Sequence, residues 1–108
     1  MRGKEAEQEK MIKVRMKKSK NKVFLQASGH AMQAPKGQDI VCAAFSILWQ
    51  HTLYNCNDAE ERQDGQVDRI TIPLRTENNL ALCRAFHRSV EVLAGQYPDN
   101  LEFDYEQE

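Results

Sequence analysis

Two spacings of apolar residues alternate along this chain, and together they limit the folds it can adopt. Near the N-terminus, Ile12, Val14 and Met16 alternate with basic residues, which is the period-two pattern of a half-buried strand. The polar run KKSKN then predicts a turn, and KVFLQAS predicts a second strand that ends at Gly29. We expect these two strands to form an antiparallel hairpin.

Two longer segments show the spacing of three and four residues that is typical of helices. The first is expected from about Ile40 to Tyr54, with Asp39 as its N-cap and Thr52 interrupting its apolar stripe. The second is expected from about Asn78 to Gly95, with Gly95 as its terminator. The stripes consist of Val41, Ala44, Phe45, Leu48 and Leu53 in the first helix, and of Leu82, Phe86, Val90, Leu93 and Tyr97 in the second.

Period-two alternation returns twice in the second half of the chain. It predicts a strand around Ile70, Ile72 and Leu74, where Pro73 indicates an edge or exit position, and a last short strand in LEFDYE. The stretch NCNDAEERQDGQ is polar and contains Asp-Gly, so we expect a surface connection there.

The element order is therefore β-β-α-β-α-β. It predicts an α+β fold with two layers, in which two helices pack on one face of a mainly antiparallel sheet. We expect a single domain from residue 11 to residue 108, because 108 residues suffice for one core and not for two. Residues 1–10 lack apolar periodicity and are expected to be a disordered extension outside this domain.

The composition of the chain indicates the cellular compartment and the redox state of its cysteines. The chain has no apolar stretch of bilayer length and no secretory signal, so we expect a cytoplasmic protein that does not enter a membrane. Its three cysteines, Cys42, Cys56 and Cys83, form an odd number without a disulfide framework, and we interpret them as free thiols.

Charge is distributed unevenly. Residues 1–22 hold nine Lys or Arg and three Glu, whereas residues 58–108 hold five Arg and twelve acids. A basic front end is compatible with a ribosomal surface, and a non-catalytic ribosome-associated binding protein is therefore an alternative function. The basic residues alternate with apolar ones, however, which favours a solvated strand face and requires no direct nucleic-acid binding.

One histidine and one cysteine flank the loop before the first predicted helix. Cys42 is expected in the first turn of that helix, where free backbone amides and the helix dipole favour a thiolate over a thiol. His30 follows Gly29 at the exit of a strand, and an imidazolium there would stabilise the thiolate further. Such a pair can attack a carbonyl and then protonate the leaving amine. The competing interpretation is that Cys42 is a small core residue.

The residues between His30 and Asp39 are expected to form a substrate loop that closes over an extended peptide. This loop consists of Ala31, Met32, Gln33, Ala34, Pro35, Lys36, Gly37 and Gln38.

Three segments, SGHA, KGQDIVCAAFSIL and LAGQYPDNLEFDY, together resemble the Prp family of bacterial ribosomal-processing cysteine proteases. The resemblance covers residues 11–105. It implies a Cys/His dyad endopeptidase, with His30 as base and Cys42 as nucleophile, and a homodimer. It also implies a substrate: the precursor of ribosomal protein twenty-seven of the large subunit, from which the family removes an N-terminal extension. The loop segment MQAPK departs from the family pattern, so the subsite preference stays open.

Asp39 and Ser46 also match family positions, and each has two interpretations. Ser46 lies one turn beyond Cys42, where it either hydrogen-bonds near the thiol or substrate or bonds back to the helix backbone, and the structural role is favoured. Asp39 either orients His30 or only caps the helix, and the cap alone is favoured. A carboxylate close to the thiol would oppose its ionisation unless it is directed at His30.

Other candidate residues are assigned structural roles. His51 and Cys56 lie near the end of the first helix, and Cys83 and His87 are four residues apart on the second, but no further ligands at metal-site spacing accompany them. Trp49, Leu53 and Tyr54 belong either to the core or to a dimer surface. No phosphate-binding loop, Ser/His/Asp motif or RNA-binding aromatic signature is present. We expect no metal and no cofactor.

Overall fold

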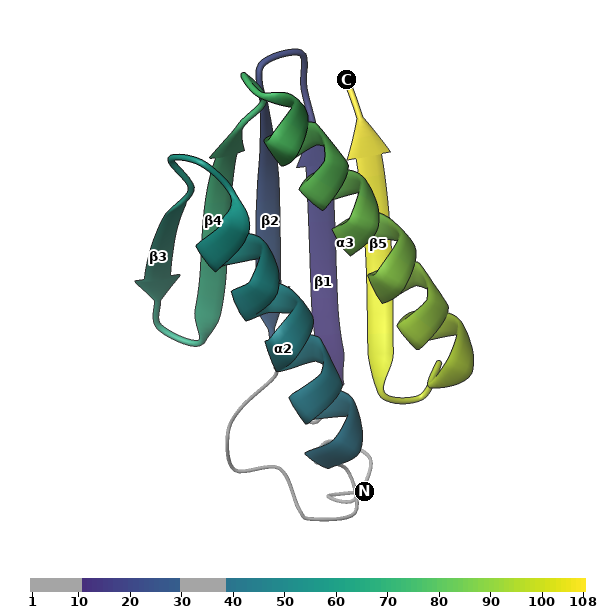
Figure 1. The fold of residues 1–108 in the computed structure, drawn as a ribbon. Coiled ribbons are helices and arrows are strands. Elements are labelled where there is room, and N and C mark those ends of the chain that lie inside the picture. The colour runs from purple at the N-terminus through teal and green to yellow at the C-terminus, as the bar shows by residue number, and fades with distance from the viewer. Residues whose placement is uncertain (1–10, 30–38) are drawn as a thin grey trace.

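The computed structural model describes residues 11–29 and 39–108, with the backbone alone at residue 39. Two helices and five strands make up this part of the chain (Figure 1). Their bounds are β1 Ile12–Lys18, β2 Lys22–Ser28, α2 Asp39–Asn55, β3 Glu60–Asp64, β4 Val67–Pro73, α3 Glu77–Gln96 and β5 Leu101–Gln107.

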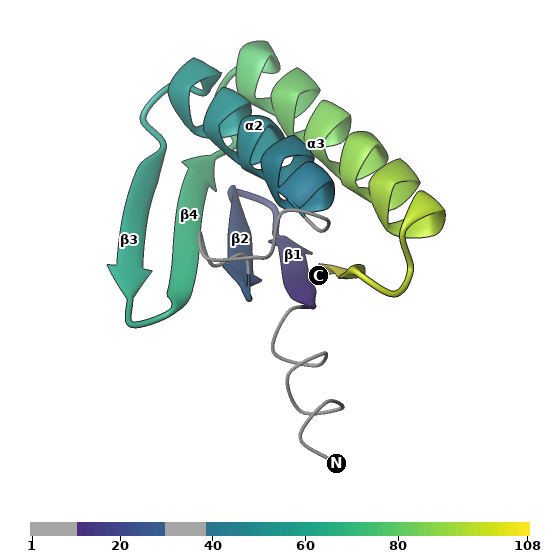
Figure 2. The same ribbon diagram turned by 90° about the horizontal axis from the view of Figure 1, so that it is seen from below.

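The strands form one sheet in the order β3-β4-β2-β1-β5. All neighbours pair antiparallel except β1 and β5, which are parallel. Both helices lie on the same face of the sheet, so the α+β class with two layers is confirmed (Figure 2). The hairpin of β1 and β2 forms as predicted, and Ser19 closes its turn by donating from its backbone N–H to the Lys22 carbonyl at 2.9 Å.

The predicted order lacks one strand. The observed order is β-β-α-β-β-α-β. The segment expected to be a surface connection contains β3, which pairs with β4 across a turn at Gly65 with φ +66°. All five residues of β3 are exposed, so they carry no apolar alternation that could reveal a strand. Its hydrogen bonds to β4 are what make it a strand. This addition makes β4 an inner strand, and Pro73 therefore occupies an exit position and not an edge.

The core lies between the sheet and the helices. Alternate residues of β1 and β2 point into it, in agreement with the period-two pattern, and Thr52 also belongs to the buried row of α2 instead of interrupting it. The Thr52 hydroxyl is satisfied there because it donates to the Leu48 carbonyl at 2.9 Å. The largest fully buried apolar side chains are Phe45, Phe86, Ile12, Leu25, Ile70, Ile72 and Leu101.

The helices begin and end close to the predicted positions. In α3, the Thr76 hydroxyl caps the first turn by accepting from the Asn79 backbone N–H at 3.0 Å. Gly95 does not end this helix, which continues to Gln96 and closes with a Tyr97 N–H to Leu93 carbonyl bond. Within the described ranges, neither helix is long and apolar enough to cross a lipid bilayer.

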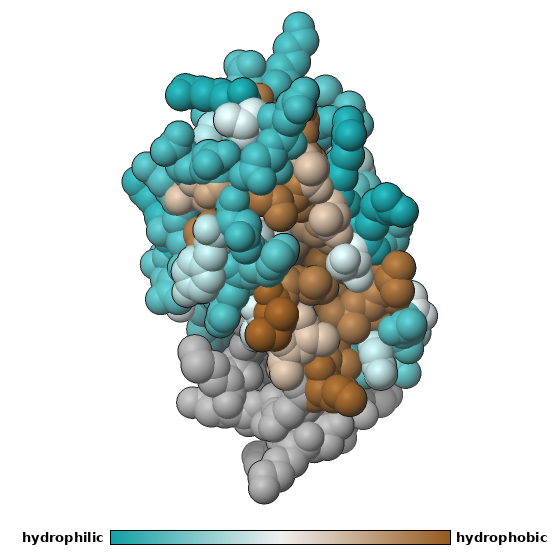
Figure 3. Space-filling view, viewed as in Figure 1, coloured by the Kyte–Doolittle hydropathy of each residue, from teal (hydrophilic) through white to brown (hydrophobic). Residues whose placement is uncertain are grey.

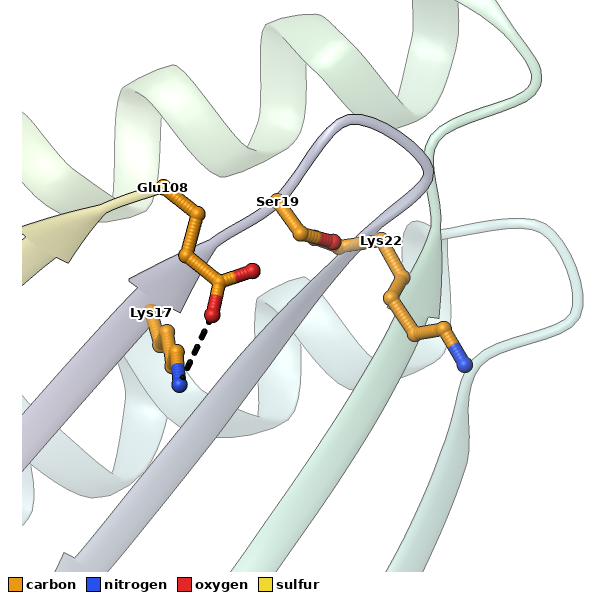
Figure 4. Close-up of polar contacts among 4 residues, drawn as sticks. All are labelled: Lys17, Ser19, Lys22 and Glu108. Atoms are coloured by element: carbon orange, nitrogen blue, oxygen red, sulfur yellow. Dashed lines mark hydrogen bonds and ion pairs between the residues drawn. The ribbon is translucent and has the colours of Figure 1, made fainter.

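The face of the sheet opposite the helices is charged, and the basic residues of β1 on it lie beside acidic residues of β5. Each basic residue of β1 on this face is in register with an acid of β5: Lys13 with Glu102, Arg15 with Asp104 and Lys17 with Glu106. The Lys17 ammonium also lies 3.0 Å from a carboxylate oxygen of Glu108, which raises the pKa of Lys17 (Figure 4). The basic residues of β1 are thus locally compensated, which favours the solvated strand face over a nucleic-acid surface.

Candidate active site

The end of β2 and the start of α2 lie at the same end of the molecule (Figure 1). Gly29 follows β2 directly and has φ +80°, a conformation that residues with a Cβ rarely adopt. A Cβ at this position would run into the carbonyl oxygen of Met11, so the backbone approaches too closely for any other residue. The Gly of the Gly-His motif is therefore required by local structure.

Cys42 is the fourth residue of α2 and lies in its first turn, as predicted. Its side chain is half-buried and packs against the edge of the core, and its thiol is not part of a disulfide. The backbone N–H groups of a first helical turn lack intrahelical acceptors and carry partial positive charge. This location can stabilise a thiolate at Cys42 and the oxyanion that forms when a thiolate attacks a carbonyl.

His30, the loop 31–38 and the side chain of Asp39 lie outside the described residues. The pairing of His30 with Cys42, the closing of the loop and the two roles considered for Asp39 therefore stay predictions. For Asp39 the structure gives the backbone position, the first residue of α2. Ser46 is half-buried one turn after Cys42.

The other two thiols are unlike Cys42. Cys56 follows the end of α2, Cys83 lies on α3, and both are buried. Burial raises the pKa of Cys56, and burial together with the neighbouring Cys56 raises the pKa of Cys83 to about 12. Both stay protonated at neutral pH and are poor nucleophiles.

The two histidines singled out earlier have structural contacts. The His87 ring stacks on Tyr105, with ring centroids 4.2 Å apart, and Asn55 donates to the His51 carbonyl at 2.8 Å. No three His, Cys, Asp or Glu side chains are grouped as a metal site in the part of the chain that the structure describes.

Trp49 belongs to the core and not to an exposed surface. Its side chain is 4% exposed and contacts the rings of Phe45 and Phe86. Its indole N–H donates to a carboxylate oxygen of Glu61 at 3.0 Å. Sequence reasoning missed Glu61, which it placed in a surface connection; a buried Trp in need of an acceptor was the available signal. Tyr54, by contrast, is exposed, and Leu53 is half-buried.

Comparisons with known proteins agree with this arrangement. The family model described as "Cysteine protease Prp" matches residues 11–102. The chain belongs to the cysteine protease Prp family. A curated Prp relative is the ribosomal processing cysteine protease Prp of Mycoplasma pneumoniae, which is 33% identical over 84 residues, covering 74% of this chain and 84% of the relative.

Two solved structures share the Prp fold. The Streptococcus mutans protein SMU.848 superposes with a TM-score of 0.73 at 21% identity, covering 94% of this chain and 98% of that protein. The essential ribosomal processing protease Prp from S. aureus, solved in complex with a substrate peptide, superposes with a TM-score of 0.70 at 21% identity, covering 88% and 99%. The fold is thus shared, and the family assigns cysteine protease activity.

Proposed function

We propose that this protein removes the N-terminal extension of ribosomal protein twenty-seven of the large subunit, with Cys42 as nucleophile and His30 as general base. The observation that carries the proposal is the position of Cys42, half-buried in the first turn of α2 at the end of the molecule where β2 ends. Membership of the Prp family supports the reaction class, and the names of the Prp relatives support a ribosomal substrate. We place this activity in the cytoplasm.

The proposed reaction has two stages. The Cys42 Sγ attacks the scissile carbonyl carbon, and the negative charge that develops on the carbonyl oxygen is stabilised by the amides of the first turn of α2. The C–N bond then breaks as the His30 imidazolium gives its proton to the leaving amine. A water molecule, deprotonated by His30, hydrolyses the thioester and restores the thiol. Asp39 and Ser46 support this site, and residues 31–38 contact the substrate.

A junction-peptide assay tests the proposal. We expect Cys42→Ser and Cys42→Ala to reduce kcat for a peptide that spans the junction of the extension by at least about 10³-fold, because the nucleophile is lost. Cys83→Ser is the matched control, since its buried thiol has no part in the reaction. Cleavage by Cys42→Ala at the rate of the wild type would refute the assignment.

We also propose that the protein is a homodimer and that the helical face forms the contact. A groove of about 630 Å³ runs between α2 and α3; Val92, which lines it, is 59% exposed, and Ile47 of α2 is 64% exposed. Figure 3 shows apolar side chains gathered over these helices. The groove is lined by Ala44, Leu48, Ala85, Arg88, Ser89, Val92, Leu93 and Gln96. Its small residues leave room for the side chains of a second copy.

Sedimentation distinguishes this dimer from a monomer. Val92→Glu places a charge in the proposed contact and is expected to yield a monomer. Phe24→Glu is the matched control, because Phe24 is 42% exposed on the opposite face of the sheet. If the dimer persists in Val92→Glu and dissociates in Phe24→Glu, the proposal is wrong and the contact lies on the opposite face of the sheet.

The alternative of a non-catalytic ribosome-associated binding protein rests on the basic residues of the N-terminal region. The register of β1 with β5 weighs against it within β1, because Lys13, Arg15 and Lys17 are each in register with an acidic residue of β5.

A further inference from the structure

The face of the sheet opposite α2 and α3 has two halves with different charge patterns (Figure 2). In the half formed by β1 and β5, each basic residue of β1 is in register with an acid. In the half formed by β2, β4 and β3, Arg62 is in register with Arg69, next to the buried Ile70, so both arginines are on the face away from the helices. Like charges directly opposite each other are unfavourable. This second half therefore favours an anionic ligand.

Only one of the two arginines has a carboxylate partner in the part of the chain that the structure describes. Arg69 Nη1 lies 3.1 Å from Asp64 Oδ2, whereas Arg62 forms no ion pair there. Both arginines are exposed, so their guanidinium groups are accessible. Guanidinium groups match the geometry of phosphate oxygens and bind them in pairs of hydrogen bonds. Arg62 is thus available for a phosphate group.

Two hollows of about 450 and 570 Å³ adjoin in this half, and both are lined by Glu60 and Thr71. The first is also lined by Arg62 and Arg69 and the second by Lys22 and Arg75, which gives four basic residues. The acidic residues that line them are Asp58 and Glu60. The basic residues outnumber the acidic ones even when Asp64, the partner of Arg69, is counted with them. The joined hollows therefore carry net positive charge.

An exposed aromatic ring lies among these basic residues. Phe24 of β2 is 42% exposed and lines the first hollow. The Lys22 ammonium lies 5.5 Å from the centroid of its ring. Phe24 is in register with Thr71, and Thr71 with Glu60, so a hydroxyl and a carboxylate lie beside the ring on the same face. The sequence shows no such motif because these residues come from three strands that only the sheet brings together.

We propose that this half of the sheet binds single-stranded RNA, with a base stacked on Phe24 and neighbouring phosphates held by Arg62, Arg69 and Lys22. Aromatic rings that stack bases, set in a positively charged surface, are how proteins bind single-stranded nucleic acid. The carboxylates of an acidic peptide would pair with the arginines and leave the ring uncovered. The Glu60 carboxylate can accept from a base amino group or from a 2′-hydroxyl, which favours RNA over DNA.

This binding site is separate from the candidate active site and goes beyond the proposed function. Cys42 lies on α2, which covers the other face of the sheet. RNA binding at Phe24 therefore does not depend on whether the protein cleaves the junction peptide. Cleavage of the isolated peptide should in turn be the same in the wild type and in variants of Phe24.

Fluorescence anisotropy with a labelled single-stranded RNA of about twelve nucleotides, at about 50 mM salt, tests the role of the ring. Phe24→Leu keeps an apolar side chain and removes the ring, and it is expected to raise Kd about 5- to 50-fold. Phe24→Tyr keeps the ring and should leave Kd within about twofold. Tyr54→Ala is the matched control, because Tyr54 is an exposed aromatic residue of α2.

The salt dependence of the same binding tests the phosphate contact. Arg62→Gln should raise Kd about 3- to 10-fold and lower the slope of log Kd against log salt by about 0.7, the value for one phosphate contact on a single strand. Lys13→Gln is the matched control, since it removes one positive charge from the half formed by β1 and β5. It should leave both quantities close to those of the wild type.

These measurements would overturn the proposal in any of three ways: the wild type does not bind the RNA, Phe24→Leu binds as well as Tyr54→Ala, or Arg62→Gln and Lys13→Gln have the same salt slope. DNA of the same sequence should bind at least about 5-fold more weakly than the RNA. Equal binding of that DNA would contradict the assignment to RNA. Polyglutamate at equal charge concentration should not displace the RNA, and displacement would assign the face to an acidic protein instead.

Discussion

The two ends of α2 differ in how they are held. At the C-terminal end, Asn79 of α3 is 1% exposed and makes three hydrogen bonds to neighbouring backbone: it accepts from the Asn57 N–H and donates to the carbonyls of Asn57 and Pro73, all at 2.7–2.9 Å. At the N-terminal end, Cys42 is half-buried and the neighbouring Ile40 is exposed. The end that holds Cys42 is thus the more exposed of the two, and the other end is closed by a buried polar network.

Because of this difference, the hydrogen bonds that stabilise α2 and the exposed thiol of Cys42 lie at opposite ends of the helix. The 17 residues of α2 span roughly 25 Å, so the network anchors the helix far from the thiol. A buried amide with all its hydrogen bonds made is costly to disturb, which makes the anchored end rigid. The thiols follow the same division, because Cys56 and Cys83 lie at the closed end and Cys42 at the open end.

The largest expected effect comes from removing the anchor. Asn79→Ala leaves the Asn57 N–H and two carbonyls without their partner, and we expect the free energy of unfolding to fall by about 2 to 4 kcal/mol. Urea unfolding measures this loss.

Asn78→Ala is the matched control for that experiment, because the Asn78 amide is exposed and its loss should cost less than about 1 kcal/mol. The rate of Cys42 alkylation, measured below the unfolding transition, should be the same in both variants. An Asn79→Ala protein as stable as Asn78→Ala would show that the network does not anchor the helix.

The second prediction compares the rates at which the thiols at the two ends of α2 are alkylated. In the folded protein at pH 7, iodoacetamide should label Cys42 at least about 100-fold faster than Cys83, since burial holds the pKa of Cys83 near 12 and hides its sulfur. Mass spectrometry after timed quenching measures each site. The midpoint of the Cys42 rate against pH should lie below about 8.5, the value for a free thiol.

Two further samples complete the thiol experiment. In denaturant all three cysteines should react at similar rates, because the differences arise from the fold. If folded Cys42→Ser takes up label as fast as the wild type, the open and closed ends do not differ in reactivity.

Most elements could be predicted because their signals are local. The alternation in β1 and β2 and the helical spacing after Asp39 follow from which side chains must be buried, and neighbouring residues carry that information. The exposed β3 could not be found in this way. The predicted end of α3 at Gly95 was also wrong. A glycine within a helix lowers its stability by only about 1 kcal/mol relative to alanine, and the packing of the buried residues of α3 offsets this loss.

The candidate site was predicted only in part for the same reason. The position of Cys42 in a first helical turn follows from local sequence. The burial of Trp49 and its bond to Glu61 do not, because these residues are 12 positions apart and belong to different elements.

The sequence by itself determined the strands β1, β2, β4 and β5, both helices, and the thiol at the start of α2, since periodicity and helix-start signals act over a few residues. The tertiary structure decided that β5 adds to β1 in parallel, that β3 extends the sheet beyond β4, and which flank of α2 faces that hairpin. These features depend on hydrogen bonds and contacts between segments distant in the chain, and such bonds form only when the sheet and the helices are assembled together.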